Sequence, residues 1–325
     1  MPPYTIAVAG GTGGIGRALV AGLVEQSKHK ILVLSRNVHA PPTPPNLTHI
    51  LPRSTSIPTI ATSYDSVATL KNTLQEHGVD IVVSALILAT PENSQAQLNL
   101  IEAAVQSGTV KKFIPSEYGI HYTEEVATFH PAARYWLDAA AALRTSHLHF
   151  TRIVFGWTLD HYGLPRVHSY MKPFRYVLDF DARRAAVPGD GTQPVSFLHT
   201  ADLARYVGAV VDGEGAWPEG VDAGEKWTVT YDSIETLEKG EATMLPQPEG
   251  APTEAEYPGM REMISEFGLM ATRGVLDVSG VGVRNGEFPW IKPMSVEEVV
   301  EKAWGKGVGL KGGGCEVGDN STRIK

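Results

Sequence analysis

A glycine-rich loop between an apolar run and an amphipathic segment constrains the fold of this chain more than any other feature. Residues 4–9 are predicted to form a buried strand, and from residue 14 to residue 25 apolar side chains recur at helical spacing. The loop between them satisfies G-x-G-x-x-G when read from Gly11 and G-x-x-G-x-x-G when read from Gly10. In this strand, turn and helix context, the backbone can approach a pyrophosphate, which also meets the free N–H groups of the helix N-terminus.

We therefore predict a dinucleotide-binding turn, with a plain tight turn as the alternative. The predicted turn comprises Gly10, Thr12, Gly13, Gly14, Ile15 and Gly16.

Apolar runs alternate with helical segments through the first half of the chain. Further strands are expected at 31–34, 80–83, 112–115 and 150–155, with helices at 66–77, 92–107 and 131–146. This rhythm predicts an α/β fold, a doubly wound parallel (Rossmann) sheet with a smaller irregular substrate lobe. We expect residues 1–155 to form the dinucleotide-binding domain and residues 156–325 the lobe, with a flexible tail at 307–325.

After residue 155 the rhythm weakens. Residues 195–199 are predicted to form one more strand, and a helix beginning at Thr200 is expected to return residues 193–212 to the sheet. Proline- and glycine-rich connections are expected from 212 to 258. Residues 295–304 should form a last helix, because Ser-Val-Glu-Glu at its start is a capping box.

The residue that follows the second strand predicts the choice of cofactor. Twenty residues beyond Gly16 the chain has Arg36, where a site for NAD would usually place a carboxylate on the ribose 2′-hydroxyl. An arginine can instead hydrogen-bond a 2′-phosphate through its planar fork. The expected cofactor is NADPH, and the alternative for Arg36 is a solvated side chain at a strand end.

Charge and composition exclude several other classes. With 28 Lys and Arg against 36 Asp and Glu, the net charge is −8, which disfavours nucleic-acid binding. The single Cys315 favours a reducing compartment, and no apolar stretch approaches the ~18 residues of a spanning helix. The amino-terminal segment lacks the pattern of a signal peptide, so we expect a cytosolic protein without a membrane partner. No H-E-x-x-H or G-x-S-x-G motif is present, and no metal site is predicted.

The segment Lys112-Phe-Ile-Pro-Ser-Glu-Tyr-Gly119 resembles a strand-end motif of the NmrA-like and isoflavone-reductase-like family of atypical short-chain dehydrogenases. Further segments of this chain resemble fungal members of the family: Gln97-Leu98, 188–191, 200–205, 231–240 and 293–304. The resemblance implies a substrate cleft between the two parts, at the carboxyl ends of the strands. It also implies a role for particular residues. The glycines at 10, 13 and 16 would hold the pyrophosphate, Arg36 the 2′-phosphate, Ser84 and Ala85 the adenosine side, and Ser116, Glu117, Tyr118, Phe155, Gly156 and Trp157 would lie around the nicotinamide. For Phe155, packing in the core is an equal alternative.

One departure from the family pattern concerns the proton donor. Reductases that this chain resembles carry a catalytic lysine on the helix after the Pro-Ser-Glu motif, whereas here the position falls at Trp136 or Ala139. Neither residue can relay a proton. Tyr118, His121 and His161 are the candidates to replace it, since the motifs place them nearest the cleft.

These observations predict an NADPH-dependent reductase of a small conjugated carbonyl, quinone-like or ketone substrate, plausible in fungal secondary metabolism. The aromatic and histidine-rich segment 157–176 favours an aromatic or polyketide-like substrate. Two alternatives follow from the missing lysine. The chain could bind NADP as a regulator without turnover, or it could use the pocket for a non-redox cyclisation or isomerisation.

Overall fold

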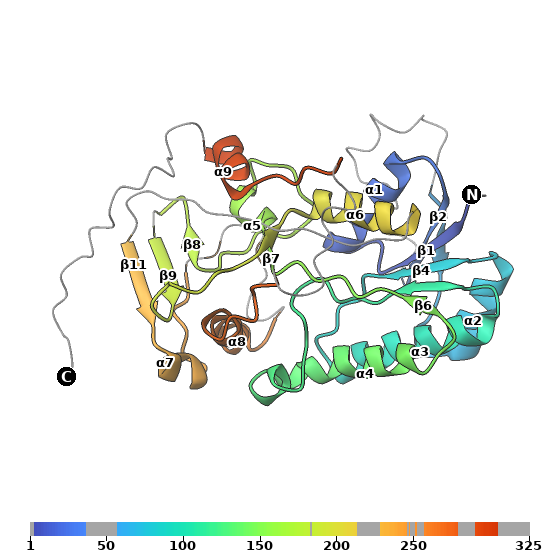
Figure 1. Ribbon diagram of the computed structural model, residues 1–325, viewed down its shortest axis with the longest axis horizontal. Helices are drawn as coiled ribbons and strands as arrows, with labels where there is room; N and C mark the ends of the chain where they lie inside the picture. The colour runs from blue at the N-terminus through green and yellow to red at the C-terminus, as the bar shows by residue number, and fades with distance from the viewer. Residues whose placement is uncertain are drawn as a thin grey trace.

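The computed structural model describes residues 3–36, 57–182, 184–212, 228–245, 247, 251, 257–278 and 290–304. A parallel sheet covered by helices forms one side of the elongated molecule, and a smaller lobe forms the other (Figure 1). The predicted tail at 307–325 and Cys315 lie outside the described residues. No helix in the described ranges is long and apolar enough to cross a membrane.

Six parallel strands form the main sheet in the order β3-β2-β1-β4-β5-β6. Their bounds are β1 (Thr5–Ala9), β2 (Lys30–Ser35), β3 (Thr59–Ala61), β4 (Ile81–Ser84), β5 (Lys112–Ile114) and β6 (His149–Phe150). The strand order changes direction between β1 and β4, and open sheets bind ligands at the carboxyl ends of strands that meet in this way. The predicted Rossmann fold is confirmed.

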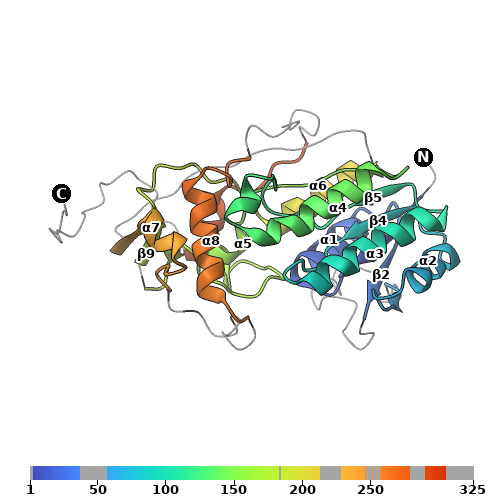
Figure 2. The same cartoon turned by 90° about the horizontal axis from the view of Figure 1, so that it is seen from below.

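Helices cover both faces of this sheet (Figures 1 and 2). On one face lie α1 (Gly14–Glu25) and α6 (Thr200–Asp212), and on the other lie α2 (Val67–Glu76), α3 (Pro91–Ser107) and α4 (Arg134–Arg144). The helices α1 and α6 approach closely, since a Cβ atom at Gly22 would lie 2.5 Å from the Cβ of Ala204. Their contact buries Leu19 and Leu203 in one core with β1 and β4.

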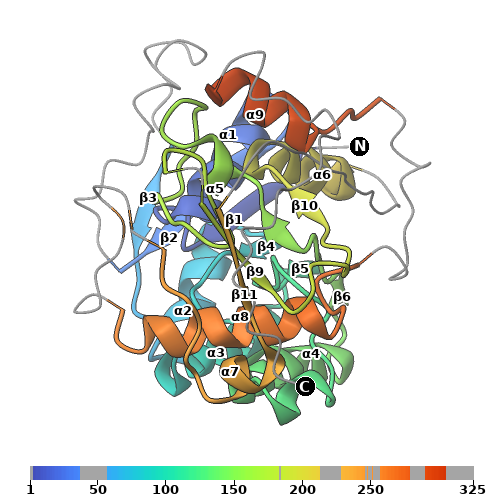
Figure 3. The same ribbon diagram turned by 90° about the vertical axis from the view of Figure 1, so that its left-hand side faces the viewer.

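Within its described residues the lobe contains two small sheets and four helices. Figure 3 views the molecule from this side. One sheet pairs β7 (Trp157–Thr158) with β10 (Phe197–Leu198) in parallel, and the other has the order β11-β9-β8, with β8 (Leu178–Asp179), β9 (Arg184–Pro188) and β11 (Thr228–Asp232). The helices are α5 (Asp160–Gly163), α7 (Ile234–Glu238), α8 (Met260–Thr272) and α9 (Val296–Trp304). Aromatic and aliphatic side chains of these elements form a separate core.

Several predicted elements differ from the structure. The strand predicted at 150–155 ends at Phe150, and the strand at 195–199 pairs with β7 rather than with the main sheet. Gly156 accounts for the second difference, because its φ is +81° and a Cβ there would lie 2.2 Å from the carbonyl oxygen of Ser196, next to β10. The segment 212–258, in which connections were expected to dominate, also includes β11 and α7. The helix α4 follows the short 3-10 helix η3 (Pro131–Ala133).

The predicted capping box at the start of α9 is confirmed. The Ser295 N–H donates to Oε2 of Glu298 at 2.8 Å, and the Glu298 N–H donates to Oγ of Ser295 at 3.0 Å.

Candidate cofactor and active site

The glycine loop forms a tight turn that joins β1 to α1. Gly10 has φ +74°, and a Cβ atom there would lie 2.6 Å from the carbonyl oxygen of Ala85. At Gly16 a Cβ would lie only 2.1 Å from the carbonyl oxygen of Gly10. Both positions require glycine because the backbones of the turn, of α1 and of the segment after β4 lie in direct contact.

Gly13 has the opposite environment. It is exposed, its φ is −79°, and a Cβ there would meet only the Gly10 carbonyl oxygen, at an ordinary 3.4 Å. Gly13 is also the N-cap of α1 and provides no side-chain cap. The folded chain itself therefore tolerates a side chain at this position, so the open backbone is available to a ligand. The neighbouring Thr12 and Ile15 are half-buried in the same turn.

Arg36 is exposed at the carboxyl end of β2. Beside it, the buried Tyr64 donates its hydroxyl hydrogen to the carbonyl oxygen of Leu34 at 3.0 Å. Burial raises the pKa of Tyr64, and the positive charge of Arg36 opposes that rise. Arg36 thus places a guanidinium at the strand end where a dinucleotide ribose is bound in this fold class.

The ends of β4 and β5 form the other border of the crevice. The Ala85 N–H donates to Ala9 at 2.8 Å, while the buried Ser84 hydroxyl has no hydrogen-bond partner among the described residues. Ser116 donates two hydrogen bonds, from its N–H to Oε1 of Gln97 at 3.1 Å and from its hydroxyl to the Leu86 carbonyl oxygen at 2.8 Å. These bonds hold the loop after β5 against the loop after β4.

Glu117 takes part in a buried ion pair that the sequence analysis missed. It is 1% exposed. Arg152 donates two hydrogen bonds to its carboxylate, and the bond from Nε to Oε2 is 2.6 Å long. Burial raises the pKa of Glu117, and the adjacent guanidinium opposes that effect. Arg152 also lies 3.4 Å from Nε2 of His121 and 3.4 Å from the Tyr122 carbonyl oxygen. The signal was an arginine within an otherwise apolar run, at 150–155.

The three candidate proton donors have different environments. Burial raises the pKa of Tyr118, whose hydroxyl has no partner in the described part of the chain. Partial burial and then the charge of Arg152 lower the pKa of His121. Burial lowers the pKa of His161 to about 4. All three shifts favour the uncharged side chain, so at neutral pH Tyr118 keeps its phenolic hydrogen and neither imidazole gains a positive charge.

The residues predicted to flank the nicotinamide divide between two cores. Phe155 is buried with β1 and β4 in the core of the main sheet, and its N–H donates to the Gly119 carbonyl oxygen at 2.9 Å. Trp157 is buried in the lobe, where its ring centre lies 4.5 Å from that of Tyr176. Gly156 joins the two cores. The roles predicted for these residues remain predictions, and the structure supplies their positions.

Aromatic packing occupies the region where the family lysine was expected. Trp136 stacks on Tyr122 with ring centres 4.1 Å apart and an angle of 11° between the planes. Ala139 is 2% exposed and lies in the core between α4 and the sheet. His130, beside this stack, pairs with Glu266 of α8 at 2.6 Å. Of the two candidate positions, only Trp136 is partly exposed.

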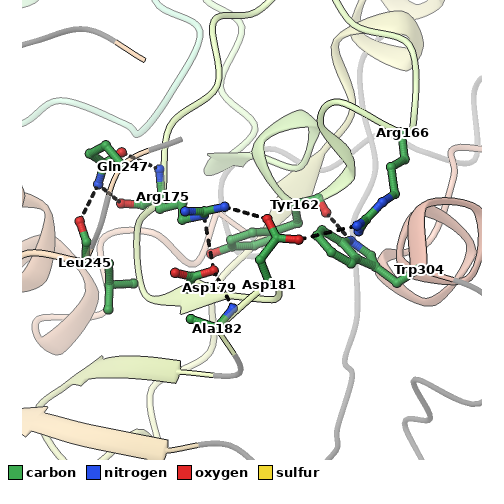
Figure 4. Close-up of polar contacts among 9 residues, drawn as sticks. All are labelled: Tyr162, Arg166, Arg175, Asp179, Asp181, Ala182, Leu245, Gln247 and Trp304. Carbon is green, nitrogen blue, oxygen red and sulfur yellow. Dashed lines mark hydrogen bonds and ion pairs between the residues drawn. The ribbon is translucent and has the colours of Figure 1, made fainter. Parts of the chain in front are cut away.

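The lobe contains a cavity of about 490 Å³. Rings and apolar side chains from α5, the segment 173–180 and α9 form its wall, together with Arg175 and Asp181. Figure 4 shows Arg175 reaching Asp181, at 2.6 Å, and Arg166 lying over the Trp304 ring, 3.4 Å from its centre. The indole N–H of Trp304 donates to the Tyr162 carbonyl oxygen at 2.9 Å. The wall is therefore aromatic, with ion pairs at its edge.

The fold and the glycine turn define a dinucleotide-binding α/β protein. The chain belongs to the NmrA-like family, whose model matches residues 2–237. The oxidoreductase swnN of Metarhizium robertsii is 32% identical to it, over 92% of this chain and 97% of that protein. The oxidoreductase BOA1 of Botryotinia fuckeliana is 33% identical over 68% of this chain and 77% of that protein. The predicted family and the predicted class, an oxidoreductase, are confirmed.

Solved structures share the fold at low sequence identity. A leucoanthocyanidin reductase of Vitis vinifera in complex with NADPH is 18% identical, with a TM-score of 0.65 over 92% of this chain and 99% of that one. The structure of AtPrR2 with NADP+ and (+)pinoresinol is also 18% identical, with a TM-score of 0.64 over 92% of this chain and 98% of that one.

Proposed function

We propose that this protein is an NADPH-dependent reductase of a small conjugated carbonyl, quinone-like or ketone substrate. The observation that carries the proposal is the open backbone at Gly13, in a turn that is otherwise closed by its neighbours, at the crevice between β1 and β4. The exposed Arg36 at the end of β2 supports NADPH over NADH. Two fungal relatives named as oxidoreductases support redox turnover.

The residues of the crevice fit this cofactor. The glycine turn and the N–H groups at the start of α1 would hold the pyrophosphate, and Arg36 would hold the 2′-phosphate. When bound, NADPH supplies a hydride. Tyr118 is our candidate for the residue that protonates the product, because its phenol is protonated at neutral pH and its hydroxyl lacks a partner among the described residues.

The lobe cavity supports a small aromatic or polyketide-like substrate. Its volume of about 490 Å³ lies within the range of small-molecule sites, and rings such as Tyr162 and Phe174 line it. A short segment links this cavity to the cofactor turn, since Met171 packs on Gly14 and Pro173, two residues further on, lines the cavity. Relatives in complexes with pinoresinol and with NADPH are consistent with this substrate class. A cytosolic location and a role in fungal secondary metabolism belong to the same proposal.

A binding and turnover experiment tests the proposed function. Thermal shifts with NADPH, NADP+, NADH and NAD+ measure cofactor choice, and NADPH absorbance then follows turnover of enones, quinones and ketones. We expect stabilisation by NADP(H) and oxidation of NADPH with at least one substrate class. Binding without turnover across the panel would instead favour an NADP-binding regulator, and absence of binding would refute the assigned cofactor.

A further inference from the structure

A short segment of the lobe packs on the first turn of α1. A Cβ atom at Gly14 would lie 2.7 Å from Sδ of Met171 and 3.2 Å from the carbonyl oxygen of Tyr170. Residues 169–172, which we call the strap, therefore lie against one side of the helix N-terminus. The other side of this turn, at Gly13, is open. The strap thus lies beside the turn at which a pyrophosphate would bind.

One buried carboxylate anchors the strap. Oδ1 of Asp160 accepts a hydrogen bond from the hydroxyl of Ser169, and the Ser169 Oγ accepts a bond from the Met171 N–H at 3.0 Å. Asp160 is 1% exposed, whereas Ser169 is half-buried, so the carboxylate side of the anchor is shielded from water. The position of Met171 over α1 consequently depends on the Ser169 hydroxyl.

The same carboxylate also caps α6. Oδ2 of Asp160 accepts from the Thr200 N–H at 2.8 Å, and Oδ1 accepts from the Thr200 hydroxyl at 2.6 Å. Nε2 of the buried His199 lies 3.6 Å from Oδ1. Nδ1 of that ring accepts from the Ala201 N–H, so the ring hydrogen is assigned to Nε2 and faces Asp160.

These contacts connect the strap, α6 and α1 to one another. Asp160 holds the start of α6, α6 packs on α1 at Gly22, and α1 begins at Gly14, where the strap returns to it. Because α1 carries the glycine turn, the strap and the turn are fixed to one frame. Neither can shift relative to the other without breaking a buried hydrogen bond to Asp160 or the contact between the helices.

We propose that Asp160 and Ser169 are positioning residues that hold the strap against α1 and thereby set the affinity for the cofactor pyrophosphate. This inference rests on the proposed function, since it requires that NADPH binds at the glycine turn. A free strap would have to be ordered each time the cofactor binds, and ordering flexible chain lowers affinity. Neither residue touches the reacting atoms.

Two variants that remove a hydrogen bond from the same carboxylate oxygen test the proposal. Ser169→Ala frees the strap, whereas Thr200→Val removes only the hydroxyl bond from α6 and keeps the bond from the Thr200 N–H. For Ser169→Ala we expect the Kd of NADPH to rise about tenfold, because the bonds from the Ser169 hydroxyl to Asp160 and from the Met171 N–H to Ser169 are both lost. Tm should fall in this variant as it does in Thr200→Val, so only the Kd distinguishes the two. Ser169→Ala should bind adenosine 2′,5′-bisphosphate, which lacks the pyrophosphate bridge, with unchanged Kd.

The control variant should separate positioning from stability. Thr200→Val should lower Tm but leave the Kd of NADPH unchanged. Ser169→Thr keeps a hydroxyl at this position and should bind NADPH as tightly as the parent protein, in contrast to Ser169→Ala. Unchanged NADPH affinity in Ser169→Ala would overturn the proposal, as would an equal loss of affinity for both ligands. Failure of the unaltered protein to bind NADPH would refute the proposed function itself, and with it this inference.

Discussion

Replacement of Gly13 by valine should separate cofactor binding from folding. The new Cβ would meet only the Gly10 carbonyl oxygen, at 3.4 Å, and the backbone φ of −79° suits any residue. Valine is a poor N-cap, so we expect Gly13→Val to lower the free energy of unfolding by about 1 kcal/mol. The branched side chain would occupy the open face of the turn and exclude the pyrophosphate.

The loss of binding should be much larger than the loss of stability. If the side chain prevents two backbone N–H groups from reaching phosphate oxygens, at roughly 1.5 kcal/mol or more each, the Kd of NADPH rises by about 100-fold or more. Isothermal titration calorimetry measures this change, and urea unfolding measures the stability. Gly16→Val provides the contrast, because its Cβ would lie 2.1 Å from the Gly10 carbonyl oxygen and should destabilise the fold by about 3 kcal/mol.

Two results would refute this reasoning. If Gly13→Val bound NADPH as tightly as the parent protein, the cofactor would bind away from the glycine turn. If Gly13→Val were as unstable as Gly16→Val, the conclusion that the fold tolerates a side chain at position 13 would be wrong.

Four further predictions address other groups. Arg36→Ala should weaken NADPH by roughly 1.5–3 kcal/mol and leave NADH unaffected, and equal affinity of the parent for both cofactors would contradict it. Tyr118→Phe should lower kcat by about 100-fold or more at unchanged NADPH Kd, whereas an unchanged kcat would assign proton delivery to water. Arg152→Met leaves Glu117 buried without its partner and should reduce the free energy of unfolding by about 3–5 kcal/mol in urea titrations; a loss below 1 kcal/mol would show that the pair is dispensable. The folded-state pKa of His161 is about 4, below its unfolded value of 6.5, so the unfolded chain binds more protons between these values. Stability should therefore fall as the pH decreases from 6.5 to 4, by up to about 3 kcal/mol relative to His161→Phe, and parallel pH profiles of the two proteins would contradict this.

Features with a local cause could be predicted from the amino-acid order. The bounds predicted for α1, 14 and 25, agree with the structure, because apolar spacing and the preceding glycines act within one turn of chain. The Ser295 capping box is equally local, since both of its hydrogen bonds join residues three apart. The strand order was also within reach, because parallel strands joined by helices leave few alternative topologies.

The sequence by itself thus determined the Rossmann sheet, the glycine turn and the expected phosphate-binding arginine. Only the tertiary structure decided which side chains meet at the crevice. Glu117 pairs with Arg152 from the segment after β6, and the strap reaches Gly14 from the lobe. The physical reason is that periodicity and capping act between residues close in the chain. Contacts between distant segments form only when the cores close, and Asp160 then joins the strap to α6 in an interior where each buried polar group needs a partner.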